Sequence, residues 1–233
     1  MITSQLDRDV ILNRVLEIKK KIEYAAAKSG RKLDEINLMA VTKNVSADLV
    51  NVAINSGINL LGENRAQELN SKYYDYERDN VDIHFIGHLQ RNKVRTIINK
   101  VSMIESVDSE HLAREIGKHA IKNNKIMPVL LEVNIGMQQT KTGFYPDKIL
   151  EQVKIISTIP GIKIKGLMVI PPKENVVYYF EKIREIYIDI SLEKIDNVGM
   201  DFLSMGMSDD FEQAIACGSN IVRIGSLIFG SRY

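Results

Sequence analysis

Residues 37–55, NLMAVTKNVSADLVNVAIN, contain the unit that decides the fold. An apolar run, NLMAVTK, comes first, and a short polar turn follows it. Val50, Ala53 and Ile54 come next, and their spacings of one, three and four place them on one face of a helix. The stretch therefore predicts a β-strand followed by an α-helix.

Similar apolar runs recur along the chain. They lie at residues 37–43, 60–64, 84–87, 103–107, 128–134, 166–170, 202–206 and 221–226. Helical periodicity separates most of them, for example at Leu112, Ile116 and Ala120. Strands that alternate with helices predict a parallel sheet, and eight such units predict an α/β fold of the (β/α)8 or TIM barrel type. An open doubly wound sheet is the alternative, but no G-x-G-x-x-G motif follows the first strand to favour it.

The two ends of the chain complete this prediction. Residues 8–29 carry Ile11, Val15, Ile18 and Ile22 on one helical stripe. The sequence ends seven residues after the eighth run, so we expect no eighth helix and expect the N-terminal helix to cover the barrel there. Because no linker is visible, we predict a single domain over residues 1–233, with the helix at about 8–29 and the barrel at about 36–233.

Composition excludes several classes of protein. The chain has 31 basic and 30 acidic residues, so no overall charge favours nucleic acid or an anionic membrane. No apolar run approaches the length of a membrane-spanning helix. Cys217 is the one cysteine, which excludes an intramolecular disulfide and fits a reducing compartment. We therefore expect a cytoplasmic protein with no nucleic-acid or membrane partner.

Lys43 stands at the end of the first run. In (β/α)8 barrels the active site lies at the carboxyl ends of the strands. The ordinary interpretation is a lysine whose stem packs on the rim while its amine reaches water. The functional interpretation is a lysine whose amine becomes neutral in a partly apolar site and attacks a carbonyl to form a Schiff base.

Residues 203–230, LSMGMSDDFEQAIACGSNIVRIGSLIFG, carry the second signal. They span the last two strands, where these barrels often bind phosphate, and Ser204, Gly225 and Ser226 supply hydroxyls and bare backbone. Glycine turns are also common without any ligand. Arg223 lies inside an apolar strand and needs a partner, which is either an acid such as Glu132 or a ligand atom.

The remaining polar residues are weaker signals. Asn64 follows the second strand and is consistent with a turn, while Met168 in the sixth strand is consistent with simple packing. We interpret His88 as structural and the basic residues between 91 and 95 as a solvated helix face. The tyrosines between 73 and 76 are predicted to lie on a surface helix.

Six ordered motifs resemble the pyridoxal phosphate homeostasis protein family, from about residue 36 to the C-terminus. They are AVTKNVSADLV, LLGENRAQEL, HFIGHLQRNKV, EVNIGMQQTKTGF, GLMVIPP and the stretch 203–230. The resemblance implies a barrel similar to the N-terminal domain of alanine racemase. It also implies that Lys43 forms an internal aldimine with pyridoxal 5′-phosphate.

The resemblance implies roles for the other candidates as well. Ser204, Gly225 and Ser226 would hold the phosphate, and Arg223 would face the pyridine nitrogen. The cofactor would be lined by Asn64 and Met168. Ser226 stands where the family often has threonine, which keeps the hydroxyl. No metal ligand and no dedicated catalytic residue are expected.

These residues favour a cofactor-binding protein over an enzyme. A permanently cationic Arg223 disfavours protonation of the ring nitrogen, which makes the cofactor a poorer electron sink. Racemases of this fold add a tyrosine from a second domain and a dimer partner, for which we find no counterpart. We expect a monomer that takes part in pyridoxal phosphate homeostasis and serves pyridoxal phosphate-dependent apo-enzymes. A pyridoxal phosphate-dependent amino-acid racemase and a Schiff-base aldolase are the alternatives.

Overall fold

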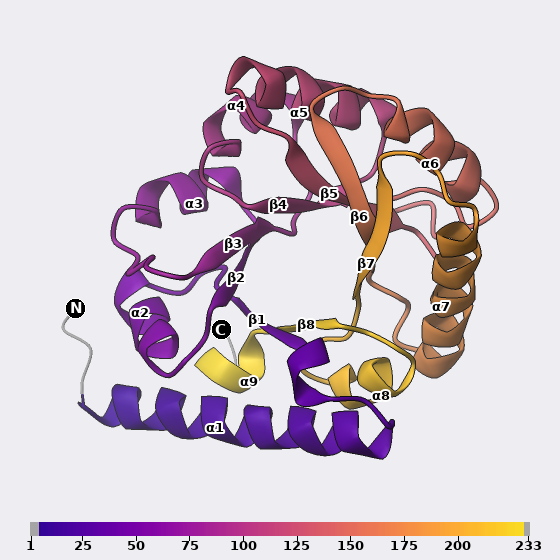
Figure 1. Cartoon of the computed structure of the whole chain (residues 1–233). Coiled ribbons are helices and arrows are strands. Elements are labelled where there is room, and N and C mark those ends of the chain that lie inside the picture. Colours follow the sequence, from indigo (N-terminus) through magenta and orange to yellow (C-terminus); the bar gives the residue numbers. More distant parts are fainter. Residues whose placement is uncertain (1–4, 231–233) are drawn as a thin grey trace.

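The computed structural model describes residues 5–230, and side chains from residue 7 onward. Eight parallel strands within this range close into a barrel in sequence order, which confirms the predicted (β/α)8 fold (Figure 1). The strands are β1 (Asn37–Val41), β2 (Leu60–Glu63), β3 (Asp82–Phe85), β4 (Met103–Val107), β5 (Met127–Val133), β6 (Ile162–Val169), β7 (Val198–Ser204) and β8 (Ile221–Ile224).

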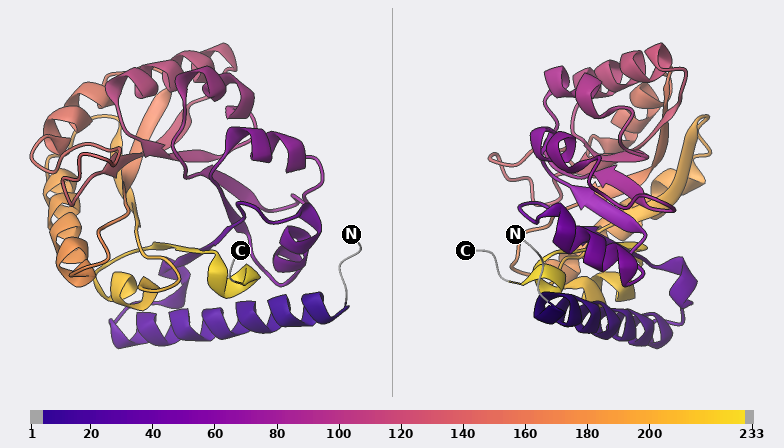
Figure 2. Two further views of the ribbon diagram at one scale, coloured as in Figure 1. Left: turned by 180° about the vertical axis from the view of Figure 1, so that it is seen from behind. Right: turned by 90° about the vertical axis from the view of Figure 1, so that its left-hand side faces the viewer.

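Helices surround the barrel, as Figure 2 shows from two further directions. They are α1 (Gln5–Lys28), α2 (Ala47–Asn55), α3 (Ala66–Lys72), α4 (Val94–Ile97), α5 (Glu110–Lys122), α6 (Ile149–Ser157), α7 (Val176–Leu192), α8 (Phe211–Ala216) and α9 (Ser226–Phe229). Two short 3-10 turns, η1 (Leu33–Glu35) and η2 (Arg91–Lys93), precede β1 and α4.

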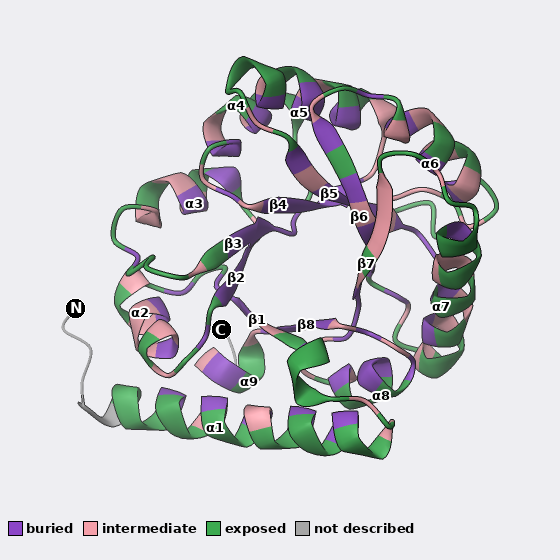
Figure 3. Ribbon diagram, viewed as in Figure 1, coloured by how far each residue is buried: buried purple, intermediate pink, exposed green. Residues whose placement is uncertain are grey.

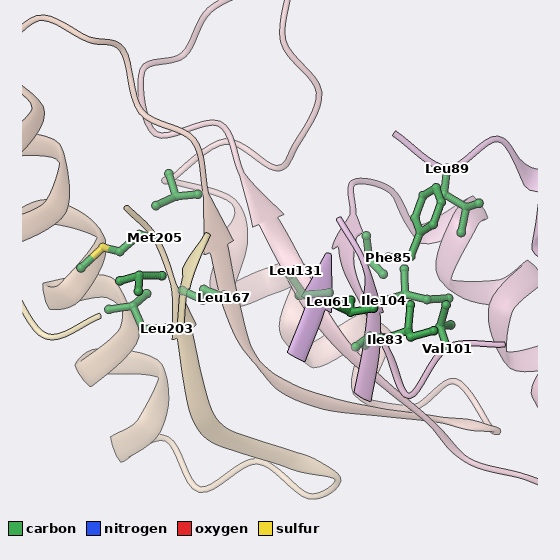
Figure 4. Close-up of a cluster of buried hydrophobic side chains, with 14 of the residues drawn as sticks. Leu61, Ile83, Phe85, Leu89, Val101, Ile104, Leu131, Leu167, Leu203 and Met205 are labelled. Carbon is green, nitrogen blue, oxygen red and sulfur yellow. The ribbon is translucent and has the colours of Figure 1, made fainter. Parts of the chain in front are cut away.

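Most strand residues outside β7 are buried on both faces of the sheet, which explains their nearly continuous apolar sequences. Outward-facing side chains such as Leu61, Phe85 and Ile104 pack against the helices in the main core (Figure 4). Inward-facing side chains form two smaller clusters inside the barrel, one around Met39 and Ile86 and one around Met103, Leu130 and Met168. The main hydrophobic core thus lies between barrel and helices, and the barrel interior is left for polar groups as well.

Helix α1 lies across the outside of the barrel, as predicted. Its buried stripe of Ile11, Val15, Ile18 and Ile22 faces the barrel, while the opposite side is exposed (Figure 3). It packs on α8, α2 and α9. Arg14 and Lys19 donate hydrogen bonds from α1 to the backbone oxygens of Ile228 and Gly57, respectively, at 3.3 and 2.9 Å.

The structure corrects the predicted end of the barrel. A short helix, α9, follows β8 directly, whereas no eighth helix was expected. Its four residues are too few to cover the barrel wall, so α1 still packs over this side. The predicted last residues of the barrel, 231–233, lie outside the described part of the chain.

Most strand ends differ from the predicted ones by a few residues. The first strand ends at Val41 and not at Lys43, because Lys43 and Asn44 form a turn. Asn44 has a φ of 58°, a left-handed conformation that asparagine tolerates better than most residues. Strand β6 begins four residues earlier than predicted, at Ile162, where an alternating IKIK pattern exposes Lys163 while Ile162 and Ile164 are buried.

Candidate functional site

Lys43 lies on the turn that follows β1, at the carboxyl end of the barrel. Thr42 before it is buried, whereas Lys43 and Asn44 are exposed. The turn closes through a hydrogen bond of 3.1 Å from the backbone N–H of Val45 to the carbonyl oxygen of Thr42. Lys43 therefore belongs to a tight turn that follows the strand and not to the strand itself.

The closing seam of the barrel brings this turn beside the end of β8. Strands β1 and β8 pair in parallel, with Met39 opposite Arg223 and Ala40 opposite Ile224. Gly225 follows β8 directly and is half-buried, and Ser226 is exposed at the start of α9. The register thus places Lys43, Gly225 and Ser226 at neighbouring strand ends on one side of the mouth.

Arg223 lies inside the barrel beneath this rim and is 4% exposed. Its Nη1 donates to Oγ of Ser204 at 2.8 Å, and its Nη2 donates to the carbonyl oxygen of Val169 at 2.8 Å. Burial lowers the pKa of the guanidinium, and the charge of Glu105 opposes this shift. The hydrogen-bond partners are therefore Ser204 and Val169, and not the Glu132 carboxylate suggested by the sequence.

Arg223 is the end of a polar chain that crosses the barrel interior. Ser204 donates from Oγ to Oε2 of Glu105 at 2.6 Å, and Oε1 of Glu105 lies 2.6 Å from Nδ1 of His84. Glu105 and Ser204 are fully buried. The carboxylate of Glu105 offsets the buried charge of Arg223 through one intervening hydroxyl, which is how the barrel accommodates an arginine in an apolar strand.

Ser204 lies inside the barrel and not on its rim. Its hydroxyl is engaged by Arg223 and Glu105 inside the barrel, while Ser226 stands on the rim. Met168 is also interior and packs with Met103 and Leu130. Of the sequence candidates, the structure thus groups Ser204, Arg223 and Met168 below the rim, and Lys43, Gly225 and Ser226 on it.

Asn64 belongs to a third group. It follows β2, the strand next to β1, and lines a cavity of about 340 Å³ that extends across the mouth to β5 and β6. The lining comes from the ends of β2, β3, β5 and β6, and it includes Ile86, His88, Glu132 and Thr142. The Oδ1 atom of Asn64 is buried and has no hydrogen-bond partner within residues 5–230. A Cβ on Gly87 would collide with the Asn64 carbonyl, so only glycine allows these two strand ends to approach so closely.

Glu132 is the acidic group of this cavity. Burial, followed by repulsion from Asp108, raises the pKa of its carboxyl, and a hydrogen bond from Thr142 at 3.3 Å and the charges of Arg223 and His88 oppose the shift. His88 is exposed and lies 3.1 Å from Asp108, measured from Nδ1 to Oδ2. His88 also lines a larger hollow of about 790 Å³ beside the start of α5.

Sequence reasoning missed the polar residues that support this mouth. Glu105 and His84 lie within strands and are buried. For Glu105, a charged residue within an apolar strand was the sequence feature that could have indicated a buried polar partner. Tyr76 was expected on a surface helix, which is wrong because α3 ends at Lys72 and Tyr76 is 4% exposed. Its hydroxyl donates to Oε1 of the fully buried Glu63 at 2.5 Å, and burial and this carboxylate raise the tyrosine pKa.

Two further features concern the described residues as a whole. Among residues 5–230, no group of three or more histidine, cysteine, aspartate or glutamate side chains is arranged to hold a metal ion. In the same part of the chain, no helix combines the length and the apolar character that crossing a bilayer requires.

Comparison with known proteins places this barrel in a family. The sequence pattern described as "Alanine racemase, N-terminal domain" matches residues 17–233. A protein of Aquifex aeolicus named pyridoxal phosphate homeostasis protein is 42% identical over 225 residues, which cover 95% of this chain and 96% of that protein.

Two solved structures are also similar. A protein from Bifidobacterium adolescentis superimposes with a TM-score of 0.94 at 31% identity, and the match covers 98% of both chains. PipY of Synechococcus elongatus, solved with pyridoxal phosphate (PLP) bound, superimposes with a TM-score of 0.78 at 27% identity, over 90% of this chain and all of PipY. The chain belongs to the pyridoxal phosphate homeostasis protein family, whose barrel is that of the alanine racemase N-terminal domain.

Proposed function

We propose that this protein binds PLP at the barrel mouth through a Schiff base on Lys43 and takes part in intracellular PLP homeostasis without catalytic turnover. The observation that carries the proposal is the β1–β8 register, which sets an exposed lysine beside Gly225 and Ser226 and above the buried Arg223. The PLP-bound structure of PipY and the names of the relatives support it.

The residues present fit the three chemical groups of this cofactor. An aldehyde needs an amine, which Lys43 offers. A phosphate dianion needs backbone N–H groups and hydroxyls, which the Gly225–Ser226 rim offers. A pyridine nitrogen needs a donor, and Arg223 has guanidinium N–H groups beyond the two bonds described above.

Each remaining candidate has a proposed part in this site. Asn64 lines the cofactor from the cavity side, where its Oδ1 is free to accept a hydrogen bond. Ser204 and Met168 lie below the rim. Ser204 orients Arg223 and, by way of Arg223, contributes to the phosphate side of the site. Met168 packs under the ring of the cofactor. When bound, PLP supplies an aldehyde that exchanges reversibly between amines.

The covalent step needs no other reactant. Nζ of Lys43 would bond to the aldehyde carbon, and the aldehyde oxygen would leave as water with two of the nitrogen-bound protons. Reversal by water releases the aldehyde again. This reversibility suits a protein that limits free PLP and serves PLP-dependent apo-enzymes, and we propose that it does so in the cytoplasm as a monomer.

Borohydride trapping tests the proposal. Reduction in the presence of PLP should fix one label on the peptide that contains Lys43. Lys43→Ala should abolish the label but retain weaker PLP binding through the rim and Arg223. Lys118→Ala, which removes an exposed lysine from α5, is the matched control and should label like the parent. A label on a different lysine, or equal PLP affinity in Lys43→Ala and parent, would refute the linkage.

Two assays separate this function from its alternatives. A racemase loaded with PLP would accelerate exchange of the α-proton of free amino acids, and Lys43→Ala would abolish that turnover. A Schiff-base aldolase would stay colourless when PLP is added, whereas the proposed Schiff base absorbs violet light and gives the protein a yellow colour. We expect a yellow protein without sustained exchange.

A further inference from the structure

The turn that carries Lys43 is held from beneath by two side chains of α3. Nζ of Lys72 donates to the carbonyl oxygens of Thr42 and Val45 at 3.0 and 3.1 Å. Oε1 of Glu68 accepts from the backbone N–H of Asn44 at 2.5 Å. Lys72 and Glu68 also bond to each other at 2.8 Å. Every neighbour of Lys43 in the turn thus has its backbone fixed by α3.

A buried carboxylate anchors this arrangement from β2. Oε1 of Glu63 accepts from Oγ1 of Thr42 at 2.7 Å and from the hydroxyl of Tyr76 at 2.5 Å. Nζ of Lys72 lies 3.3 Å from the same oxygen, and the two side chains are 12% and 0% exposed, respectively. A buried carboxylate without a cation is costly, so Lys72 is held in place by Glu63 as well as by the turn.

We propose that Lys72, together with Glu63 and Glu68, positions Lys43 for Schiff-base formation; this inference rests on the proposed function. Lys72 acts on the backbone of the turn and does not contact the aldehyde. It fixes the backbone at Thr42 and Val45, so that the four-carbon stem of Lys43 starts from one place and one direction. Because the backbone of the turn is fixed, the amine of Lys43 samples fewer orientations. It therefore loses less conformational entropy when the bond to the aldehyde forms.

If Lys72 positions Lys43, loss of Lys72 should affect ligands that bond covalently to Lys43 and ligands that bind without a covalent bond differently. Pyridoxamine 5′-phosphate has an amine in place of the aldehyde, so it uses the same rim and the same Arg223 but forms no bond to Lys43. A defect in the turn weakens only the ligand that bonds to Lys43. A general loss of folding weakens both ligands alike.

The test is Lys72→Met, which keeps a long apolar stem and removes the amine. We expect PLP affinity to fall about tenfold or more and the absorption band of the Schiff base to appear more slowly. Affinity for pyridoxamine 5′-phosphate should stay within about twofold of the parent. Equal losses for both ligands, or no loss for either, would overturn the proposal.

A second variant tests the proposal independently in case Lys72→Met folds poorly. Glu68→Ala releases the N–H of Asn44 from a side chain that is 17% exposed, so it removes a contact nearer the surface. It should reproduce the selective loss for PLP to a smaller degree. Lys20→Met, which removes a 72% exposed lysine from α1, is the control and should bind both ligands like the parent.

The outcome also separates this inference from the proposed function. If the parent protein forms no borohydride-stable adduct with PLP, the proposed function fails. If the parent forms the adduct and Lys72→Met forms it equally fast and equally tightly, only the positioning role fails. If the adduct in the parent maps to Lys72 itself, both assignments fall.

Discussion

Arg223 shows how one residue is made compatible with a barrel interior. Its guanidinium is removed from water, and burial alone would be prohibitive for an unpaired charge. The cost is offset by Ser204, by the Val169 carbonyl and by Glu105 behind the serine hydroxyl. The arginine in an apolar run was visible in the sequence, but its partners were not, because they come from β4, β6 and β7.

A pH-dependent effect is expected at Glu132. Its carboxyl has a pKa above the usual value, so the folded protein holds this proton more tightly than the unfolded chain does. Ionisation with rising pH therefore disfavours folding. We expect Glu132→Gln to raise the melting temperature at pH 7, and the gain to vanish as pH falls below about 4.3, the pKa of an unfolded glutamate.

Thermal unfolding at pH 7 and pH 4 measures this difference. Glu151→Gln on α6 is the control, because Glu151 is 63% exposed and should show little change at either pH. A Glu132→Gln variant that is less stable than the parent by the same amount at both pH values would contradict the prediction. That result would mean that the hydrogen bond from Thr142 outweighs the cost of burial.

At the scale of elements, α1 takes the place of a full outer helix after β8. The following helix, α9, has four residues and cannot bury much of the barrel wall. The stripe of α1 supplies the missing apolar surface, and its polar side chains bond to the backbone of neighbouring segments. Helical periodicity revealed the stripe, while its position over α2, α8 and α9 follows from closure of the barrel.

Two leucine-sized residues on α1 test this role. Ile18→Ala removes a side chain that is 4% exposed, so it should destabilise the protein by about 2 to 5 kcal/mol. Leu16→Ala removes one that is 46% exposed on the same helix, and its effect should stay within about 0.5 kcal/mol. Urea unfolding compares the two variants. Similar losses for both would show that α1 is not packed on the barrel in solution.

At the scale of the whole molecule, the barrel joins chain segments that are far apart in sequence into one mouth. Lys43 and Ser226 are separated by most of the chain, yet the β1–β8 pairing makes their strands neighbours. A ligand that bonds to both segments ties the first and last strands together. Binding should therefore stabilise the closed barrel as a unit, because it favours the folded state by mass action.

Ligand-dependent melting measures this coupling. At about 100 times its dissociation constant, PLP should stabilise the parent by about 2.7 kcal/mol. For a chain of this size, that corresponds to roughly 5 to 10 °C in melting temperature. Lys43→Ala should show a smaller shift at the same PLP concentration, and pyridoxal without phosphate should shift the parent less than PLP does. Equal shifts for PLP and pyridoxal would argue against a phosphate site on the rim.

The sequence by itself determined the repeating strand–helix unit, the closed barrel and a lysine shortly after the first strand, because these depend on local periodicity and on residue type. It also pointed to Arg223 and to the glycine and serine after β8. Only the tertiary structure decided which of these residues stand on the rim and which lie inside the barrel, since strand register and burial set that.

The tertiary structure alone also revealed the support beneath the site. Ser204 turned inward to Arg223, and Tyr76 and Lys72 proved to be bonded to Glu63. Such partners are separated in the chain and meet only when neighbouring strands and helices pack. Their pairing is decided by the need to satisfy buried charges and hydroxyls, which local sequence patterns do not express.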